Sequence, residues 1–213
     1  MEPFRVLTSH AVALPRADIN TDDIIPAQYL KVTEKAGLAR GLFARWRYRP
    51  DGTPDPAFPL NRPEAQGARI LVTGPNFGSG SSREHAVWAL WQWGFRAVLA
   101  PSFADIFYHN AIKNGLLPAR LNPEDHQALL DWLEKHPQAT LTVNLETTSV
   151  ILEDGRRFAF AIDPFARQLL LQGLDELDVL LQHQEAIEAY ERARDRASPS
   201  DRRPYPPASD APR

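Results

Sequence analysis

Residues 78–85 read Gly-Ser-Gly-Ser-Ser-Arg-Glu-His and lie between an apolar stretch and an amphipathic one. The preceding run, Arg69-Ile-Leu-Val-Thr73, has the length and apolar character of a buried strand. The following residues have apolar side chains at helical spacing, and Gly94 is a typical helix terminator. This segment therefore predicts a strand, a glycine-rich turn and a helix over 81–93.

The same order of elements repeats directly afterwards. Ala97-Val-Leu-Ala100 predicts a second buried strand. Residues 102–114 predict a helix with Ser102 as its N-cap and Gly115 as its end. A strand–helix–strand–helix order is typical of α/β units with neighbouring parallel strands.

The rest of the chain changes from helical to alternating patterns. Before the central segment, 4–14 predicts a strand, 38–48 has helical spacing, and 50–63 holds five prolines and predicts a surface loop. After it, period-two alternation with short turns predicts an antiparallel meander. The predicted meander strands are 140–145, 149–153 and 157–162, and the predicted helices around them are 123–136, 164–173 and 176–194.

Composition bounds the class of protein. The chain has 213 residues, a formal net charge of −3 and 43% hydrophobic residues, as expected for a soluble globular protein. We expect one domain over 1–196 and a disordered tail over 197–213, where five of 17 residues are proline. The near-neutral charge argues against nucleic acid binding, and no apolar run is long enough for a membrane span. No signal-peptide pattern opens the sequence, so we expect a cytoplasmic protein.

The absence of cysteine is also informative. It excludes disulfides, thiol nucleophiles and cysteine-ligated zinc. It likewise excludes an iron–sulfur cluster that is bound by this chain alone. We therefore expect no cofactor and no metal on this chain.

The central segment predicts a site for an oxyanion or a carboxylate. Free amides at a helix start favour anions, Ser81 and Ser82 add hydroxyls, and Arg83 adds a planar fork that suits a carboxylate. No lysine is present for a P-loop, and Arg83 stands where a dinucleotide fingerprint needs glycine. No Gly-x-Ser-x-Gly nucleophile elbow is formed at Ser81. A plain capped helix start, with Ser81 and Glu84 as a capping box, stays open as the alternative.

Residues 76–86, Asn-Phe-Gly-Ser-Gly-Ser-Ser-Arg-Glu-His-Ala, resemble the signature of the swivelling domain in the aconitase superfamily. Within it, the chain resembles the family of bacterial 3-isopropylmalate dehydratase small subunits over about residues 4–194. That resemblance implies an α/β fold of three β/β/α layers, with a mixed sheet plus the meander. Ser79 departs from the family, which usually has a cysteine there. The segments that support the resemblance are 20–26, 41–48, 100–108 and 114–118.

The resemblance also implies a function. Members of this family form the smaller half of a two-subunit hydro-lyase in leucine biosynthesis. That enzyme interconverts 2-isopropylmalate and 3-isopropylmalate through isopropylmaleate. A [4Fe–4S] cluster is expected on the large subunit, and this chain is expected to be inactive without that partner.

Site residues follow from the family motif by position. Ser81 corresponds to the base that takes the proton from carbon, and Asp22 to an aspartate that orients a catalytic histidine of the large subunit. Ser82 and Arg83 correspond to substrate-binding residues, Arg83 as the carboxylate clamp. Leu30, Lys31 and Val32 lie where the family recognises the variable group of the substrate. A mainly apolar wall there favours an alkyl-substituted malate.

Purely structural interpretations of these residues remain open beside the functional ones. Asp22 could serve in an Asx-turn or a helix cap, and Leu30 and Val32 could be packing residues of a loop. Two other functions also remain. One is a small subunit of a related alkylmalate or homoaconitate hydro-lyase, and the other is a non-catalytic, anion-binding regulatory module.

Overall fold

The computed structural model describes residues 1–30 and 37–196. The chain divides into two compact units, Met1–Leu174 and Asp175–Arg213. The first unit contains all the strands named below, and the described part of the second unit contains helices only. The predicted disordered tail and the residues Lys31 and Val32 lie outside the described part of the chain, and the single domain over 1–196 stays a prediction.

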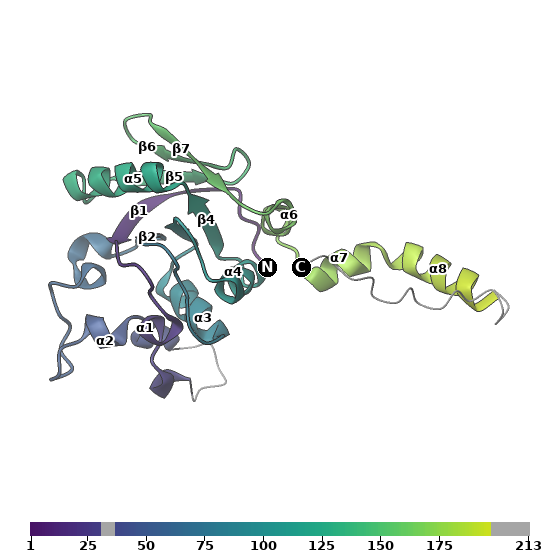
Figure 1. Cartoon of the computed structure of the whole chain (residues 1–213), viewed down its shortest axis with the longest axis horizontal. Helices are drawn as coiled ribbons and strands as arrows, with labels where there is room; N and C mark the ends of the chain where they lie inside the picture. The colour runs from purple at the N-terminus through teal and green to yellow at the C-terminus, as the bar shows by residue number, and fades with distance from the viewer. Residues whose placement is uncertain (31–36, 197–213) are drawn as a thin grey trace, which may run out of the picture. The chain divides into compact units, whose positions relative to one another are not determined.

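Seven strands of the first unit form a closed barrel in the order β1-β2-β3-β4-β7-β6-β5 (Figure 1). Strands β1 to β4 pair in parallel, and every other neighbouring pair is antiparallel. The bounds are β1 Val6–Leu14, β2 Ile70–Thr73, β3 Ala97–Ala100, β4 Leu117–Leu121, β5 Thr140–Asn144, β6 Ser149–Leu152 and β7 Arg157–Ala161.

The α/β class, the mixed sheet and the antiparallel meander are confirmed, whereas the hydrogen bonding shows a closed barrel in place of separate β layers. Strand β1 closes one side because it is long enough for two partners. Its first half pairs with β5 and its second half with β2. The other side closes at β4 and β7, through Arg120 opposite Ala161 and Leu121 opposite Phe160.

Strand β4 was not predicted, because Pro118 and Arg120 interrupt its apolar run. Pro118 nevertheless lies in the parallel ladder opposite Val98 of β3. Its missing N–H is tolerated because β7 reaches only the last two residues of this strand.

Helices flank the barrel, with α3 and α4 packed against each other and α5 in contact with β1 (Figure 1). The α-helices of the first unit are α1 Thr21–Ile24, α2 Ala44–Arg47, α3 Glu84–Trp93, α4 Asp105–Lys113, α5 Pro123–Lys135 and α6 Pro164–Gln172. The 3₁₀-helices are η1 Ala27–Tyr29, η2 Leu38–Gly41, η3 Pro59–Asn61 and η4 Pro63–Ala65. The second unit holds α7 Glu176–Gln182 and α8 Gln184–Arg196.

Three helix predictions differ from the structure. The predicted helix over 38–48 breaks into η2 and α2, because Phe43 adopts a left-handed conformation with φ of 50°. Helix α4 begins two residues late, with Ala104 as its N-cap, because the Ser102 Oγ accepts the Asn76 amide at 2.8 Å and caps no helix. The segment predicted over 176–194 ends its first helix at His183.

The strands β2 and β3 form the centre of the core, since every residue in them is buried. His126 of α5 is buried against this centre, and its Nε2 lies 2.7 Å from the Thr73 carbonyl oxygen. Burial lowers the pKa of His126, although the bond to Thr73 partly opposes that shift. No helix in residues 1–30 and 37–196 is long and apolar enough to cross a membrane.

The turn after β2 packs against α4 through an aromatic cluster. The rings of Phe77 and Phe107 meet edge to face with centroids 5.0 Å apart. Gly78 has φ of 80°, and a Cβ atom at this position would overlap the Phe107 side chain. Only glycine therefore lets the turn approach α4 this closely.

We expect Gly78→Ala to lower the free energy of unfolding by about 2–4 kcal/mol, since the substitution combines a left-handed backbone with overpacking. Gly155→Ala is the matched control, because Gly155 has φ of 86° with no atom within 4 Å of the added Cβ. The control should cost only about 1 kcal/mol. Urea unfolding of the three proteins measures both values, and equal losses would contradict the close-approach argument.

Candidate functional site

The residues that follow β1 and those that follow β2 run side by side. Both strands end at the same edge of the parallel sheet, so the chain leaves them in the same direction. A parallel bridge joins Asn20 to Ser79, and backbone hydrogen bonds continue on either side of it. These are Gly74 N to Arg16 O at 3.1 Å, Asp18 N to Pro75 O at 2.9 Å, Gly78 N to Ile19 O at 2.8 Å and Thr21 N to Ser79 O at 2.9 Å.

Helix α1 begins with a capping box that leaves Asp22 free for another partner. The Asn20 side chain accepts the Asp23 amide at 2.9 Å, and the Asp23 carboxylate accepts the Asn20 amide at 3.2 Å. Asp23 therefore has a structural role, as one half of the capping box. The alternative interpretation of Asp22 as a cap is wrong, because Asn20 and Asp23 fill both capping roles.

Asp22 and Arg83 form an ion pair across the two segments. Arg83 Nη1 donates to Asp22 Oδ1, with the Arg83 side chain 18% exposed and the Asp22 side chain 37% exposed. Within the described residues, this is the one hydrogen bond recorded for the Arg83 side chain. The other N–H groups of its planar fork remain available to a carboxylate.

Helix α3 starts later than the sequence predicts, and this exposes backbone donors. Its N-cap is Arg83, which makes no side-chain cap, so the alternative interpretation of Ser81 and Glu84 as a capping box is wrong. Across the described residues, the amides from 80 to 85 have no recorded acceptor. Together with the helix dipole, these amides suit a bound anion.

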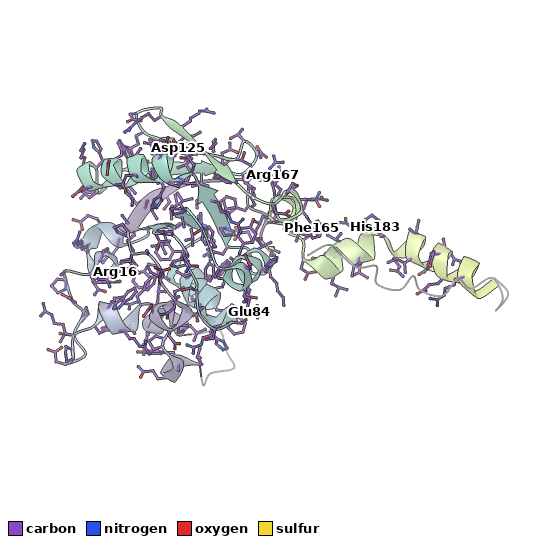
Figure 2. The ribbon with its side chains drawn as sticks, in the orientation of Figure 1. Arg16, Glu84, Asp125, Phe165, Arg167 and His183 are labelled. Atoms are coloured by element: carbon purple, nitrogen blue, oxygen red, sulfur yellow. The ribbon has the colours of Figure 1, made fainter. Side chains whose placement is uncertain are left out.

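The Glu84 side chain bonds to Asn114 at the end of α4 in place of the helix start. Its Oε1 accepts Asn114 Nδ2 at 2.8 Å, and Asn114 Oδ1 accepts Trp88 Nε1 at 2.9 Å. Asn114 is the C-cap of α4, so this network joins the first turn of α3 to the end of α4. Figure 2 labels Glu84 in the region of α3 and α4.

Ser81 and Ser82 are exposed, and with Arg83 they line a cavity of about 260 Å³. Thr21 and the start of α4 also line it, with Asp105 and with Ile106, which is 53% exposed. A larger groove of about 720 Å³ lies beside α5, but it contains none of the predicted site residues. The smaller cavity is the better candidate for an anion-binding site, because a cation, hydroxyls and unbonded amides lie around it.

The structure brings together some predicted site residues and not others. Asp22, Ser81, Ser82 and Arg83 gather on the paired segments. Leu30 ends η1, is half-buried, and is not among the residues that line the cavity. Lys31 and Val32 lie outside the described residues, so the specificity role of 30–32 stays a prediction.

Sequence reasoning missed Thr21, whose Oγ1 donates to the Ser81 carbonyl oxygen at 2.8 Å. Thr21 is adjacent to Asp22, which was the available signal, but its hydroxyl has no motif of its own. Asn114 was noted as part of a family segment without a role. Its contact with Glu84 depends on how α3 and α4 pack, which sequence periodicity does not report.

The chain does not fit a [4Fe–4S] cluster of its own, because such clusters need cysteine thiolates and the sequence has none. Across the residues that the structure describes, no three His, Asp or Glu side chains gather to hold a metal ion. The chemistry available here is therefore that of hydroxyls, amides, the Arg83 guanidinium and two carboxylates, Asp22 on Arg83 and Asp105 in the cavity wall.

Comparisons with known proteins identify the family of the chain. The family model described as Aconitase C-terminal domain matches residues 1–124, and the model LeuD_N matches 127–164. The chain is 55% identical over 193 residues to the 3-isopropylmalate dehydratase small subunit of Roseiflexus castenholzii, covering 91% of this chain and 95% of that protein.

Two further relatives extend the comparison. The small subunit of the same name from Chloroflexus aurantiacus is 56% identical over 191 residues, which cover 90% of this chain and 95% of that protein. The crystal structure of 3-isopropylmalate dehydratase from Methanocaldococcus jannaschii aligns with a TM-score of 0.63 at 28% identity. The alignment covers 87% of this chain and 99% of the chain in that structure.

Proposed function

The chain belongs to the family of 3-isopropylmalate dehydratase small subunits, and from this premise we propose how its residues serve the reaction. It is the small subunit of a two-subunit hydro-lyase in leucine biosynthesis. The enzyme interconverts 2-isopropylmalate and 3-isopropylmalate through isopropylmaleate. One observation supports the proposal most: Ser81, Ser82 and Arg83 line one exposed cavity, and Asp22 holds Arg83 from the neighbouring segment, on a chain without thiol ligands.

Arg83 binds a carboxylate of the substrate through the free part of its fork. Asp22 holds Nη1, which fixes the plane of the guanidinium and leaves the other N–H groups to the ligand. The open amides from 80 to 85 and the start of α3 add positive potential on the same side. The Ser82 hydroxyl supplies a further donor to the substrate.

Ser81 acts as the base that takes the proton from carbon. An unperturbed hydroxyl is too weak for this step, so the alkoxide needs strong local stabilisation. The available stabilising groups are the neighbouring open amides, the helix dipole and the positive charge of Arg83. Ser81 is exposed, which is compatible with a partner subunit that brings substrate to its hydroxyl.

Asp22 has a second oxygen for the large subunit. Its Oδ1 accepts from Arg83, whereas its Oδ2 has no recorded donor in the described part of the chain. A carboxylate with one oxygen engaged and one free can accept the N–H of an imidazole. This arrangement supports the role of Asp22 in orienting a catalytic histidine of the large subunit.

Apolar surface beside the serines supports an alkyl-substituted malate as the substrate. Ile106 lines the cavity and is 53% exposed, so it can cover methyl groups of a ligand. Burial of two methyl groups stabilises a complex by roughly 1–2 kcal/mol. By its position in the family, the segment of Leu30, Lys31 and Val32 is proposed to recognise the variable group as well. The expected [4Fe–4S] cluster belongs to the large subunit, since this chain offers no ligands for it.

We expect isopropylmalate turnover only when this chain is mixed anaerobically with the cluster-loaded large subunit from the same organism. The absorbance of isopropylmaleate follows the reaction, and each chain alone is the control. Turnover by this chain alone would contradict the division of the site. A higher kcat/KM for homoaconitate or another alkylmalate would reassign the substrate within the same reaction class.

We expect Ser81→Ala to lower kcat in the complex by about 10²–10⁴-fold, which is the usual contribution of a general base. Ser79→Ala is the matched control, since the Ser79 Oγ makes only a long contact of 3.4 Å to the Asp18 carbonyl. The control should retain kcat within about threefold of the unsubstituted complex. Full activity of Ser81→Ala would instead favour a non-catalytic, anion-binding module.

A further inference from the structure

Thr21 binds the backbone of the signature segment (residues 76–86) at two points. Its amide donates to the Ser79 carbonyl at 2.9 Å, and its Oγ1 donates to the Ser81 carbonyl at 2.8 Å. The residue is 2% exposed, so its hydroxyl has little access to water. A buried hydroxyl that donates to one defined acceptor constrains that acceptor strongly.

The bond from Thr21 Oγ1 sets the orientation of the peptide between Ser81 and Ser82. A peptide unit is planar, and in its trans form the C=O and the following N–H point in opposite directions. Because the Ser81 carbonyl points at Thr21, the Ser82 N–H points away from it. In the described residues this N–H has no recorded acceptor, so it is available to an anion.

Without that bond, the peptide has freedom to rotate. Such a rotation turns about ψ of Ser81 and φ of Ser82, and in the described part of the chain neither residue's amide has a recorded acceptor that would oppose it. The Ser82 side chain is exposed and does not pack the segment from outside. A rotated peptide would turn a carbonyl oxygen toward the anion in place of an N–H, which reverses the local electrostatics.

We propose that Thr21 is a positioning residue, whose hydroxyl orients the Ser81–Ser82 peptide so that the Ser82 amide faces the developing negative charge. This inference rests on the proposed function, in which Ser81 reacts as an alkoxide. Thr21 also lines the cavity, but its Oγ1 donates to the Ser81 carbonyl, so in this account it does not bind the substrate. It acts through the peptide that follows the reacting side chain.

The test compares substitutions at Thr21 in the complex with the large subunit. Thr21→Val keeps the shape and removes the donor, whereas Thr21→Ser keeps the donor and removes the methyl group. We expect Thr21→Val to lower kcat by about 10–100-fold with KM within about threefold. Thr21→Ser should retain kcat within about threefold, which is rescue by the conservative variant.

A merely structural role would give a different pattern. It would lower the melting temperature and the yield of complex, without a change in kcat per assembled site. If Thr21→Val does not assemble, Thr21→Ser and Thr21→Cys form a second matched pair, because both lack the methyl group and a thiol is a weak donor. We then expect kcat to fall by about tenfold or more for Thr21→Cys but not for Thr21→Ser.

Three results would overturn the inference. The first is an assembled Thr21→Val complex whose kcat lies within about twofold of the unsubstituted one. The second is a Thr21→Ser complex whose kcat is as low as that of Thr21→Val. The third is an equal kcat for Thr21→Ser and Thr21→Cys. The unsubstituted complex is measured first. Its failure to turn over isopropylmalate refutes the proposed function itself, whereas an active complex that is insensitive to Thr21 refutes only this inference.

Discussion

The hydrogen-bonded pairing between residues 16–21 and 74–81 is the constraint on which the candidate site depends. Strands β1 and β2 are parallel neighbours, so their carboxyl ends lie together and the two following segments can pair. The segment after β3 joins the same edge, because Phe77 and Phe103 form another parallel bridge. Ligand sites of α/β sheets commonly lie at this edge. The pairing places residues from two distant parts of the sequence on one surface.

Glycine makes this pairing possible at the points of closest approach. A Cβ at Gly74 would overlap the Arg16 backbone, and one at Gly78 would overlap the Phe107 ring. With the backbones this close, Thr21 and Asp22 reach the residues that precede α3 directly. The same helix α1 therefore restrains the backbone of Ser81 and the side chain of Arg83. The chain carries these groups at an exposed edge, as one half of a two-subunit site requires.

Sequence reasoning predicted the elements whose signal is local. The buried strands at 70–73 and 97–100, the helix after Asn122 and the meander all follow from apolar periodicity and turn residues. Family resemblance then selected Asp22, Ser81 and Arg83. The misses are tertiary in origin. Barrel closure depends on the double pairing of β1, and β4 is stabilised by its neighbours despite Pro118. Thr21 was missed because its role is a single long-range bond.

The most direct test of this account is amide hydrogen exchange in the isolated chain. The Thr21 amide donates to Ser79 and the Gly78 amide donates to Ile19, so both report on the pairing of the two segments. If the half-site is preformed, both amides exchange as slowly as those of the buried strands β2 and β3, without any partner. Exchange near the rate of an unprotected peptide, with protection gained only on addition of the large subunit, would contradict the account.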